Sequence, residues 1–270
     1  MPLSSPFLRR LGLLSVLLVF SGCGSLDPQD SPNEYTHGPS HTEVWDTLDA
    51  DHARDWFYLL NDGPSALDWR LRAIDTATES IDFQTFLWSL DTTGALVLGH
   101  LIRAADRGVN IKLLIDDTFL LGEDKLLLEI HHHPNISYRI FNPYQRRADN
   151  FATRALLNAG DFQRLDHRMH NKSIIVDNRV AIIGGRNIAD EYFGLHNKAN
   201  FRDLELLVGG QIVTTLSSSF DKYWNDQWTI PIDQLSHLES SPADLDIIET
   251  LTKNALHIHD EETSEARTAR

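Results

Sequence analysis

The stretch from Met169 to Asn187 holds the residues whose types and spacing could do chemistry. His170 and Lys172 stand two residues apart and lead directly into the apolar residues 174–176. Alternate side chains of a strand point to one face of a sheet, so this spacing predicts an imidazole and an ammonium side by side. An imidazole can act as a nucleophile or a base, and an ammonium can hold the oxygens of an anion.

A hairpin is predicted to bring more polar groups to the same place. Residues 177–179 are the turn formers Asp, Asn and Arg, and residues 180–183 form a second apolar strand. The predicted loop has two residues, either 178–179 or 177–178. Either choice fixes how the two strands pair, and both pairings place the same four residues on one face of the sheet. That set is an imidazole, an ammonium, an open glycine and an amide, namely His170, Lys172, Gly185 and Asn187. It predicts a phosphate-binding site that needs no metal and no cofactor.

The elements that must position this site are predicted from hydrophobic patterns, and strand-like and helix-like patterns alternate along the chain. Apolar runs predict strands over residues 56–60, 80–88, 109–115, 136–141 and 201–208, and helical periodicity predicts helices over 66–78, 96–106, 125–130 and 152–158. The predicted fold is α/β, with a mostly parallel sheet flanked by helices on both faces. Residues 142–168 form a long connection, a kind of segment that often borders a site. Asp116 and Asp117 end a strand, where one of them could border the pocket or cap the next segment.

Composition and charge narrow the function classes. The chain has 270 residues, of which 41% are hydrophobic and 23% charged, which is ordinary globular usage. The formal charge of -15 disfavours binding to a phosphate backbone, so no nucleic acid partner is expected. Cys23 is the only cysteine, which excludes a disulfide within the chain and a thiolate metal cluster.

The N-terminus resembles the signal peptide of a bacterial lipoprotein. Arg9 and Arg10 precede an apolar stretch over 11–20, and Ser21 and Gly22 stand before Cys23, the residue that would be lipidated. The predicted organisation is a signal peptide over 1–22, a flexible tether over 23–50, a catalytic half over 51–232 and an acidic tail over 233–270 that packs on nothing. The expected location is the bacterial cell envelope, lipid-anchored and facing the periplasm, at the outer membrane rather than the inner one.

The central motif resembles that of the phospholipase D superfamily. His170-x-Lys172-x4-Asp177 followed by Gly184-Gly185-x-Asn187 is similar to the family's HKD motif with its trailing Gly-Gly-x-Asn. The likeness extends over about residues 56–228 and is nearest to the cardiolipin synthase C branch. It implies transfer of a phosphatidyl group between membrane phospholipids.

The resemblance also implies roles for the residues. His170 would attack phosphorus, and Lys172 and Asn187 would hold the phosphate oxygens, without a divalent ion. A nucleophilic imidazole needs an acceptor at its other nitrogen, and Asp203 is the expected orienter, with Glu205 on the same strand face as the alternative. Asp177 lies at the turn, where a structural role that caps amides is favoured over a catalytic one.

One departure from the family pattern leaves the function open. Family members of the lipid-synthase kind carry two HKD motifs, whereas this chain has a single copy. The second half would come from homodimerisation or from a missing C-terminal half. The alternatives are therefore a phosphatidyltransferase or phospholipase at the membrane, a single-motif phosphodiesterase or endonuclease acting as a homodimer, and an inactive half-enzyme that only binds.

Overall fold

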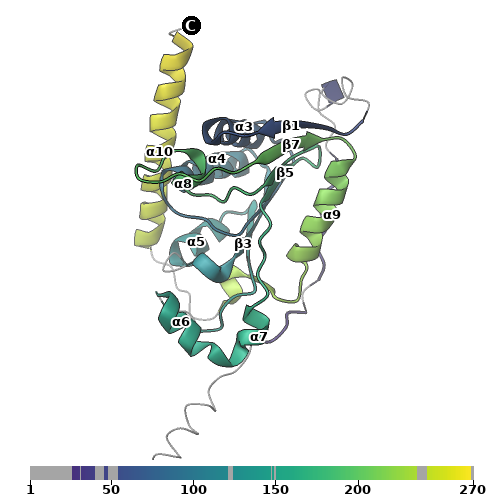
Figure 1. Ribbon diagram of the computed structural model, residues 1–270, viewed down its shortest axis with the longest axis vertical. Helices are drawn as coiled ribbons and strands as arrows, with labels where there is room; N and C mark the ends of the chain where they lie inside the picture. The colour runs from purple at the N-terminus through teal and green to yellow at the C-terminus, as the bar shows by residue number, and fades with distance from the viewer. Residues whose placement is uncertain are drawn as a thin grey trace, which may run out of the picture.

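The computed structural model describes residues 26–30, 32–39, 46–47, 54–120, 124–146, 148, 150–235 and 242–268 (Figure 1). Cys23 and the predicted cleavage site lie outside these residues, so lipidation stays a prediction. Among the described residues, no helix combines the length and the apolar character needed to cross a membrane.

One sheet runs through the described part of the chain. Its eight strands lie in the order β1-β7-β6-β5-β2-β3-β4-β8. Their bounds are β1 (Trp56–Leu60), β2 (Ser80–Thr85), β3 (Asn110–Asp116), β4 (Ile136–Phe141), β5 (Ser173–Val176), β6 (Val180–Gly184), β7 (Glu205–Gly209) and β8 (Thr229–Pro231).

The sheet is mixed, which corrects the prediction of a mostly parallel sheet. Only the pairs β2–β3 and β3–β4 are parallel within the described sheet, and the other five pairs are antiparallel. The reason lies in two connections, residues 142–172 and 185–204, each of which leaves one edge of the sheet and returns to the same edge. A strand that follows such a connection must run in the opposite direction. The same two connections carry most of the predicted site residues.

Helices cover both faces of the sheet, as predicted (Figure 1). On one face the core contains side chains from α3 (Gly63–Thr76), α4 (Thr92–Asp106), α5 (Asp124–His131), α8 (Asp190–Phe193) and α10 (Pro242–Thr268). On the other face, Val213, Phe220 and Trp224 of α9 (Ile212–Trp224) pack on the sheet. The short elements are η1 (Asp117–Phe119), α6 (Phe151–Leu157), η2 (Ala159–Asp161), α7 (Phe162–Leu165) and η3 (Ile232–Gln234).

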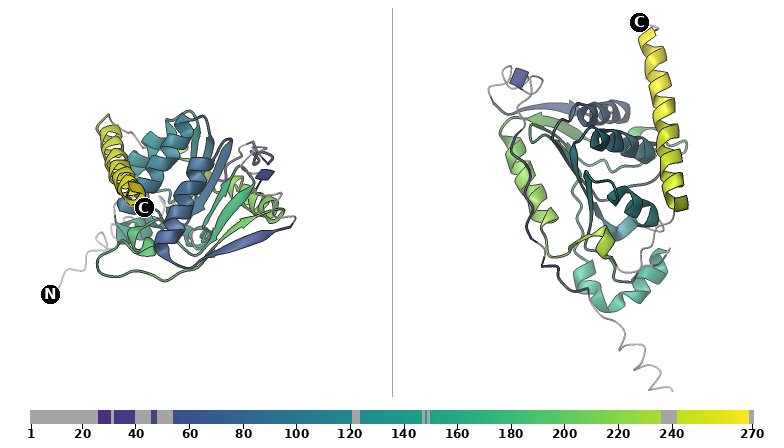
Figure 2. Two further views of the ribbon diagram at one scale, coloured as in Figure 1. Left: turned by 90° about the horizontal axis from the view of Figure 1, so that it is seen from above. Right: turned by 180° about the vertical axis from the view of Figure 1, so that it is seen from behind.

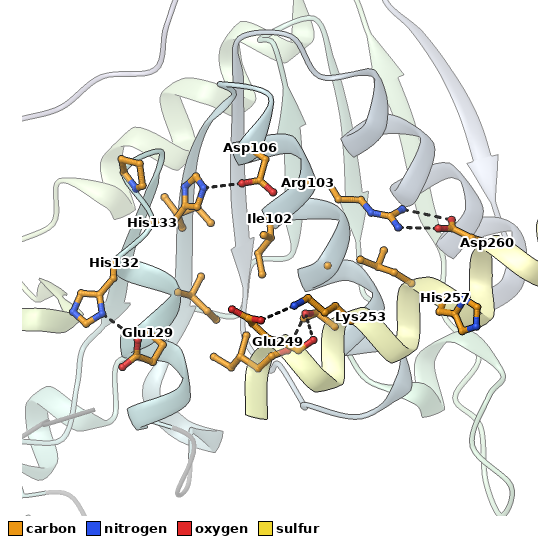
Figure 3. Close-up of a pocket in the computed structure, with 17 residues that line it drawn as sticks. Ile102, Arg103, Asp106, Glu129, His132, His133, Glu249, Lys253, His257 and Asp260 are labelled. Carbon is orange, nitrogen blue, oxygen red and sulfur yellow. Dashed lines mark hydrogen bonds and ion pairs between the residues drawn. The ribbon is translucent and has the colours of Figure 1, made fainter. Parts of the chain in front are cut away.

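The acidic tail is a helix that packs on the body, so the prediction that it packs on nothing is wrong. Ile248 and Leu256 of α10 are buried, and a side chain at Gly99 of α4 would overlap Leu256. Arg103 of α4 forms an ion pair with Asp260 at 2.8 Å. A groove of about 800 Å³ lies between α4, α5 and α10 (Figure 3). None of the predicted site residues lines this groove.

The N-terminal segment also lies against the body over residues 32–39, in contrast to the expected free tether. Glu34 accepts hydrogen bonds from Arg139 at 2.6 Å and from the indole of Trp224 at 3.1 Å. The Thr36 hydroxyl lies 2.7 Å from the Asp221 carboxylate and 2.9 Å from that of Asp82. Sequence composition missed this docking because it depends on polar bonds instead of apolar burial.

Candidate active site

The predicted site forms at the edge where the parallel strands end. β2, β3 and β4 end there at Thr85, Asp116 and Phe141, and the connection that follows β4 returns to this edge before β5. His170 lies in the last residues of that connection, and Lys172 directly precedes β5. The site therefore lies at the carboxyl ends of the parallel strands, the usual place for a site in such sheets.

His170 is exposed and its ring packs on an aromatic side chain. The centroids of the His170 and Phe86 rings are 4.8 Å apart. Partial desolvation of the ring by its neighbours and then the charge of Lys172 lower the pKa of His170, while Asp116 opposes them. The imidazole is therefore neutral at neutral pH, which is the state that can attack an electrophile.

Lys172 is buried beside His170. Its Nζ donates a hydrogen bond to the His170 carbonyl oxygen at 2.7 Å and lies 5.1 Å from the centroid of the Phe86 ring. Burial lowers the pKa of Lys172 to about 8, and the carboxylates of Asp203 and Asp116 oppose that shift. The ammonium is thus charged at neutral pH and fixed next to the imidazole.

The hairpin has a three-residue loop, which corrects both predicted registers. Val176 pairs with Val180, and Asp177 and Asn178 adopt φ values of 52° and 50° in the loop. Lys172 then lies opposite Gly184, whose amide donates to the Lys172 carbonyl at 3.3 Å. A shift of one residue in the pairing moves every side chain of one strand to the other face of the sheet. Strand alternation therefore does not place Gly185 and Asn187 on the same face as His170 and Lys172.

Asn187 is buried and both ends of its side chain are engaged. Its oxygen accepts from the Leu87 amide at 3.2 Å, and its nitrogen donates to the Tyr192 hydroxyl at 2.7 Å. The first bond fixes the backbone next to Phe86, the residue that contacts His170 and Lys172. Asn187 is therefore a positioning residue in this structure, and contact with phosphate through its second amide hydrogen stays a prediction.

Gly185 makes room for a protein carboxylate, not for a ligand as predicted. A Cβ at this position would overlap the carboxylate of Asp203. The Asp203 carboxylate lies near enough to Lys172 to oppose the lowering of that lysine's pKa. No hydrogen bond joins Asp203 to the His170 ring within the described part of the chain, so its orienting role stays a prediction.

The Glu205 carboxylate is bound by two arginines, so the prediction of Glu205 as the alternative orienter of His170 is wrong. Its carboxylate is fully buried and forms ion pairs with Arg70 and with Arg186, the latter at 3.5 Å. Arg186 also donates to the carbonyl oxygens of Leu60 at 3.0 Å and Asp203. This network holds β7 against α3, and β7 begins only at Glu205 instead of at residue 201.

Asp177 has the structural role that was favoured for it. Its buried carboxylate accepts hydrogen bonds at 2.8 to 2.9 Å from the amides of Thr78, Glu79 and Ser80 and from the Thr78 hydroxyl. These groups belong to the turn before β2, so the amides that it caps are not those of its own hairpin. Asp177 joins two strands of the sheet and does not reach His170.

Comparison with known proteins assigns the family. A family model described as "Cardiolipin synthase, PLD-like domain" matches residues 71–224, which is more than half of the chain. The chain belongs to the phospholipase D superfamily. Within it, the chain is similar to cardiolipin synthase C of Escherichia coli (strain K12), with 39% identity over 166 residues that cover 62% of this chain and 34% of the relative.

One further relative supports this assignment, and one solved structure shares the fold. A cardiolipin synthase of Staphylococcus aureus (strain N315) is 30% identical over 172 residues, covering 63% of this chain and 32% of the relative. The solved structure of phosphatidylserine synthase from Haemophilus influenzae Rd KW20 matches the fold with a TM-score of 0.50 at 13% identity, covering 73% of this chain and 43% of that chain. The chain spans about a third of the length of the curated relatives that it matches.

The structure adds Phe86, which had no role from the sequence, to this site and resolves the two roles that were open for Asp116. Phe86 contacts both the His170 ring and the Lys172 ammonium. Asp116 accepts from the Met169 amide at 2.9 Å, directly before His170, and also caps η1 through Thr118 at 2.9 Å. Asp116, the last residue of β3, therefore does both of the things that its position predicted as alternatives: it borders the site and it caps the next segment.

The pKa shifts predict a rate that falls on both sides of neutral pH. Attack needs neutral His170, so the acid limb should lie below the ordinary histidine pKa of 6.5. If Lys172 binds phosphate it must be charged, so the alkaline limb should fall through about pH 8 instead of near 10.5. The measurement is kcat/KM against pH for the natural protein and Lys172→Arg. Because arginine stays charged, its alkaline limb should move upward, and an unchanged limb would assign it to another group.

Proposed function

We propose that this protein transfers a phosphatidyl group between alcohols on membrane phospholipids through a phosphohistidine at His170. The observation that carries the proposal is the exposed His170 imidazole and the buried Lys172 ammonium, which contact the same Phe86 ring. The similarity to cardiolipin synthase C supports the lipid class, and the charge of -15 disfavours a nucleic acid substrate. These features favour a phospholipid over the phosphodiester of a nucleic acid.

The chemistry balances in two displacements at phosphorus. In the first, a ring nitrogen of His170 donates its lone pair to phosphorus, the P–O bond to the donor alcohol breaks, and that oxygen takes a proton from a general acid. In the second, the acceptor alcohol loses its proton to the same group as its oxygen bonds phosphorus, and the P–N bond breaks. Lys172 stabilises the charge on the non-bridging oxygens in both steps.

The proposed mechanism needs a general acid other than His170, because the nucleophilic nitrogen is bonded to phosphorus in the intermediate. Within the described residues no second histidine lies against His170, since its ring contacts Phe86 and no other ring. We infer that a second HKD half supplies it, either from another copy of this chain or from a second motif in a longer one. Specific activity should then follow the fraction of assembled protein.

Product analysis tests the proposed function. The protein, at several concentrations and with a metal chelator present, is mixed with vesicles of phosphatidylglycerol carrying a labelled phosphatidyl group. Labelled cardiolipin or labelled phosphatidic acid would support transfer or hydrolysis on lipid. Cleavage of single- or double-stranded DNA with no change in the lipid would overturn the proposal in favour of a nuclease. Turnover by a strictly monomeric species would contradict the shared site.

A further inference from the structure

The residues described between 26 and 39, which we call the strap, cross the sheet from the edge that carries the candidate site to the opposite edge. At the site edge, the Gln29 amide donates to the Gln227 carbonyl at 2.7 Å, and β8 begins two residues later beside the end of β4. At the opposite edge, the Asn178 side chain in the loop between β5 and β6 donates to the His37 carbonyl at 3.2 Å. Between these two points the strap follows α9 (Figure 2, right). The N-terminal end of the strap therefore lies at the site edge.

Backbone and side-chain bonds hold the strap on this path. The Glu34 amide and carbonyl pair with the side chain of Asn225, directly after α9, at 2.8 and 2.7 Å. One turn earlier, the Asp221 carboxylate accepts from the Thr36 amide at 3.0 Å and from the Thr36 hydroxyl at 2.7 Å. The Glu34 carboxylate also forms an ion pair with Arg139 of β4. The strap is thus part of the folded body and not a loose linker.

The strap leaves a short length of chain between the body and the predicted membrane anchor. Leu26 packs against the buried core. Cys23, the predicted lipidation site, precedes Leu26 by three residues and Gln29 by six. Since an extended chain spans at most about 3.5 Å per residue, a lipid on Cys23 attaches within about 10 Å of Leu26 and about 20 Å of Gln29. Such a lipid would hold the body by its site edge.

The docking of the strap limits how far the body can turn on its anchor. A loose tether over 23–50, as predicted from composition, would have an r.m.s. length of about 30 Å and would let any side of the body face the bilayer. The six residues of β2 span about 20 Å between the two edges of the sheet. With the strap docked, the chain from Cys23 to the body reaches about 10 Å, which is half of that span. The site edge therefore stays nearer to the bilayer than the opposite edge.

The candidate site lies beside the point where the strap begins. Trp228, next to Gln227, accepts from the amide of Asn142 at 2.8 Å. The Asn142 side chain donates to the His167 carbonyl at 2.7 Å, three residues before His170. The start of the strap and the nucleophile are thus connected by a short series of hydrogen bonds at one edge of the sheet.

We propose that the strap turns the site edge of the body toward the membrane in which the N-terminus is anchored, so that His170 faces the lipid headgroups. The anchor is predicted from the apolar stretch 11–20 and the residues before Cys23. The docked strap adds a direction to that anchor, because it fixes the edge of the body from which the chain leaves. The orientation goes beyond the proposed function and does not rest on it.

Energy transfer to the bilayer tests the orientation. The full chain, purified with its lipid from a bacterial host, is reconstituted into vesicles of phosphatidylethanolamine and phosphatidylglycerol that carry an acceptor dye on the headgroup. Because the lipid occupies the Cys23 thiol, a donor dye labels only the substituted position in Asp166→Cys, at the site edge, or in the matched variant Glu79→Cys, directly before β2 at the opposite edge. Both positions are exposed and acidic. Transfer should be stronger from position 166, and equal transfer, stronger transfer from position 79 or none from either position would overturn the proposal.

Strap variants separate docking from anchoring. Glu34→Ala with Thr36→Val removes the side-chain bonds of the strap to α9 and to the sheet, so transfer from the two positions should become equal while the lipid still binds the protein to vesicles. Asn33→Ala should keep the difference, because the Asn33 side chain donates to the Tyr35 hydroxyl within the strap, at 3.2 Å. A difference that persists in the double variant, with an unchanged circular dichroism spectrum, would contradict the role of the strap. Oriented protein that turns over no lipid would contradict the proposed function alone.

Discussion

His170→Ala should abolish formation of a covalent phosphoenzyme. With a labelled phosphatidyl donor and no added metal, the natural protein should trap label that is lost in acid and kept in base, as a phosphoramidate bond requires. The expected loss is complete because alanine has no lone pair to attack phosphorus, and the neutral, exposed imidazole is replaced by nothing. The measurement is acid and alkali treatment of the labelled protein after electrophoresis, followed by mapping of the labelled peptide.

Matched variants distinguish the nucleophile from its neighbours. His167 is also exposed and lies three residues earlier, where its Nδ1 contacts the Gln163 carbonyl at 2.9 Å. His167→Ala should label like the natural protein. Lys172→Ala should slow labelling by about 10²- to 10³-fold, the usual cost of one preorganised charge-stabilising donor. Full labelling of His170→Ala would place the nucleophile elsewhere and remove the proposed mechanism.

Asp177→Ala should destabilise the fold by about 3–5 kcal/mol without acting on the chemistry. The buried carboxylate accepts four hydrogen bonds from Thr78, Glu79 and Ser80, and its loss leaves three backbone amides without this acceptor. Alanine at φ 52° adds about 1 kcal/mol of strain, because only Gly, Asn and Asp adopt this region readily. Urea unfolding followed by circular dichroism measures the change.

Two controls make this prediction specific to the carboxylate. Asp177→Asn tolerates the same backbone conformation but has one acceptor oxygen instead of two, so its loss of stability should be intermediate. Asp166→Ala, at an exposed position four residues before His170, should change stability by about 0.5 kcal/mol or less. A change below about 1 kcal/mol for Asp177→Ala would show that the bonds contribute little. The labelling rate per folded molecule should be unchanged.

The sequence determined most of the elements before the HKD motif and their order, because these depend on local periodicity. Strands over Trp56–Leu60 and Ile136–Phe141 have the predicted bounds, and the helices from α3 to α6 lie within four residues of the predicted starts and ends. The spacing of His170 and Lys172 predicted that the two side chains would lie together, and both of them contact Phe86. The motif was sufficient to predict the family.

Three-dimensional packing decided the features that depend on contacts between distant residues. The loop between β5 and β6 has three residues because Asp177 bonds Thr78 to Ser80, about a hundred positions earlier, and this shifted the register that predicted Gly185 and Asn187. Glu205 was unavailable because Arg70 lies against it, a contact across 135 positions. The helix α9 and the docking of α10 were likewise not predicted.

The sheet itself was predicted from the sequence, but the direction of its strands was decided by the tertiary structure. Alternating strands and helices predicted an α/β sheet, and that part of the prediction is correct. Parallel or antiparallel pairing depends on whether a connection crosses the sheet or returns to the same edge, and a long irregular segment such as 142–172 shows neither choice in its composition. The sequence by itself therefore determined which residues could do chemistry, since residue type and local spacing are written in it. Only the tertiary structure decided which of them meet, because each of those contacts depends on the edge to which a distant segment returns.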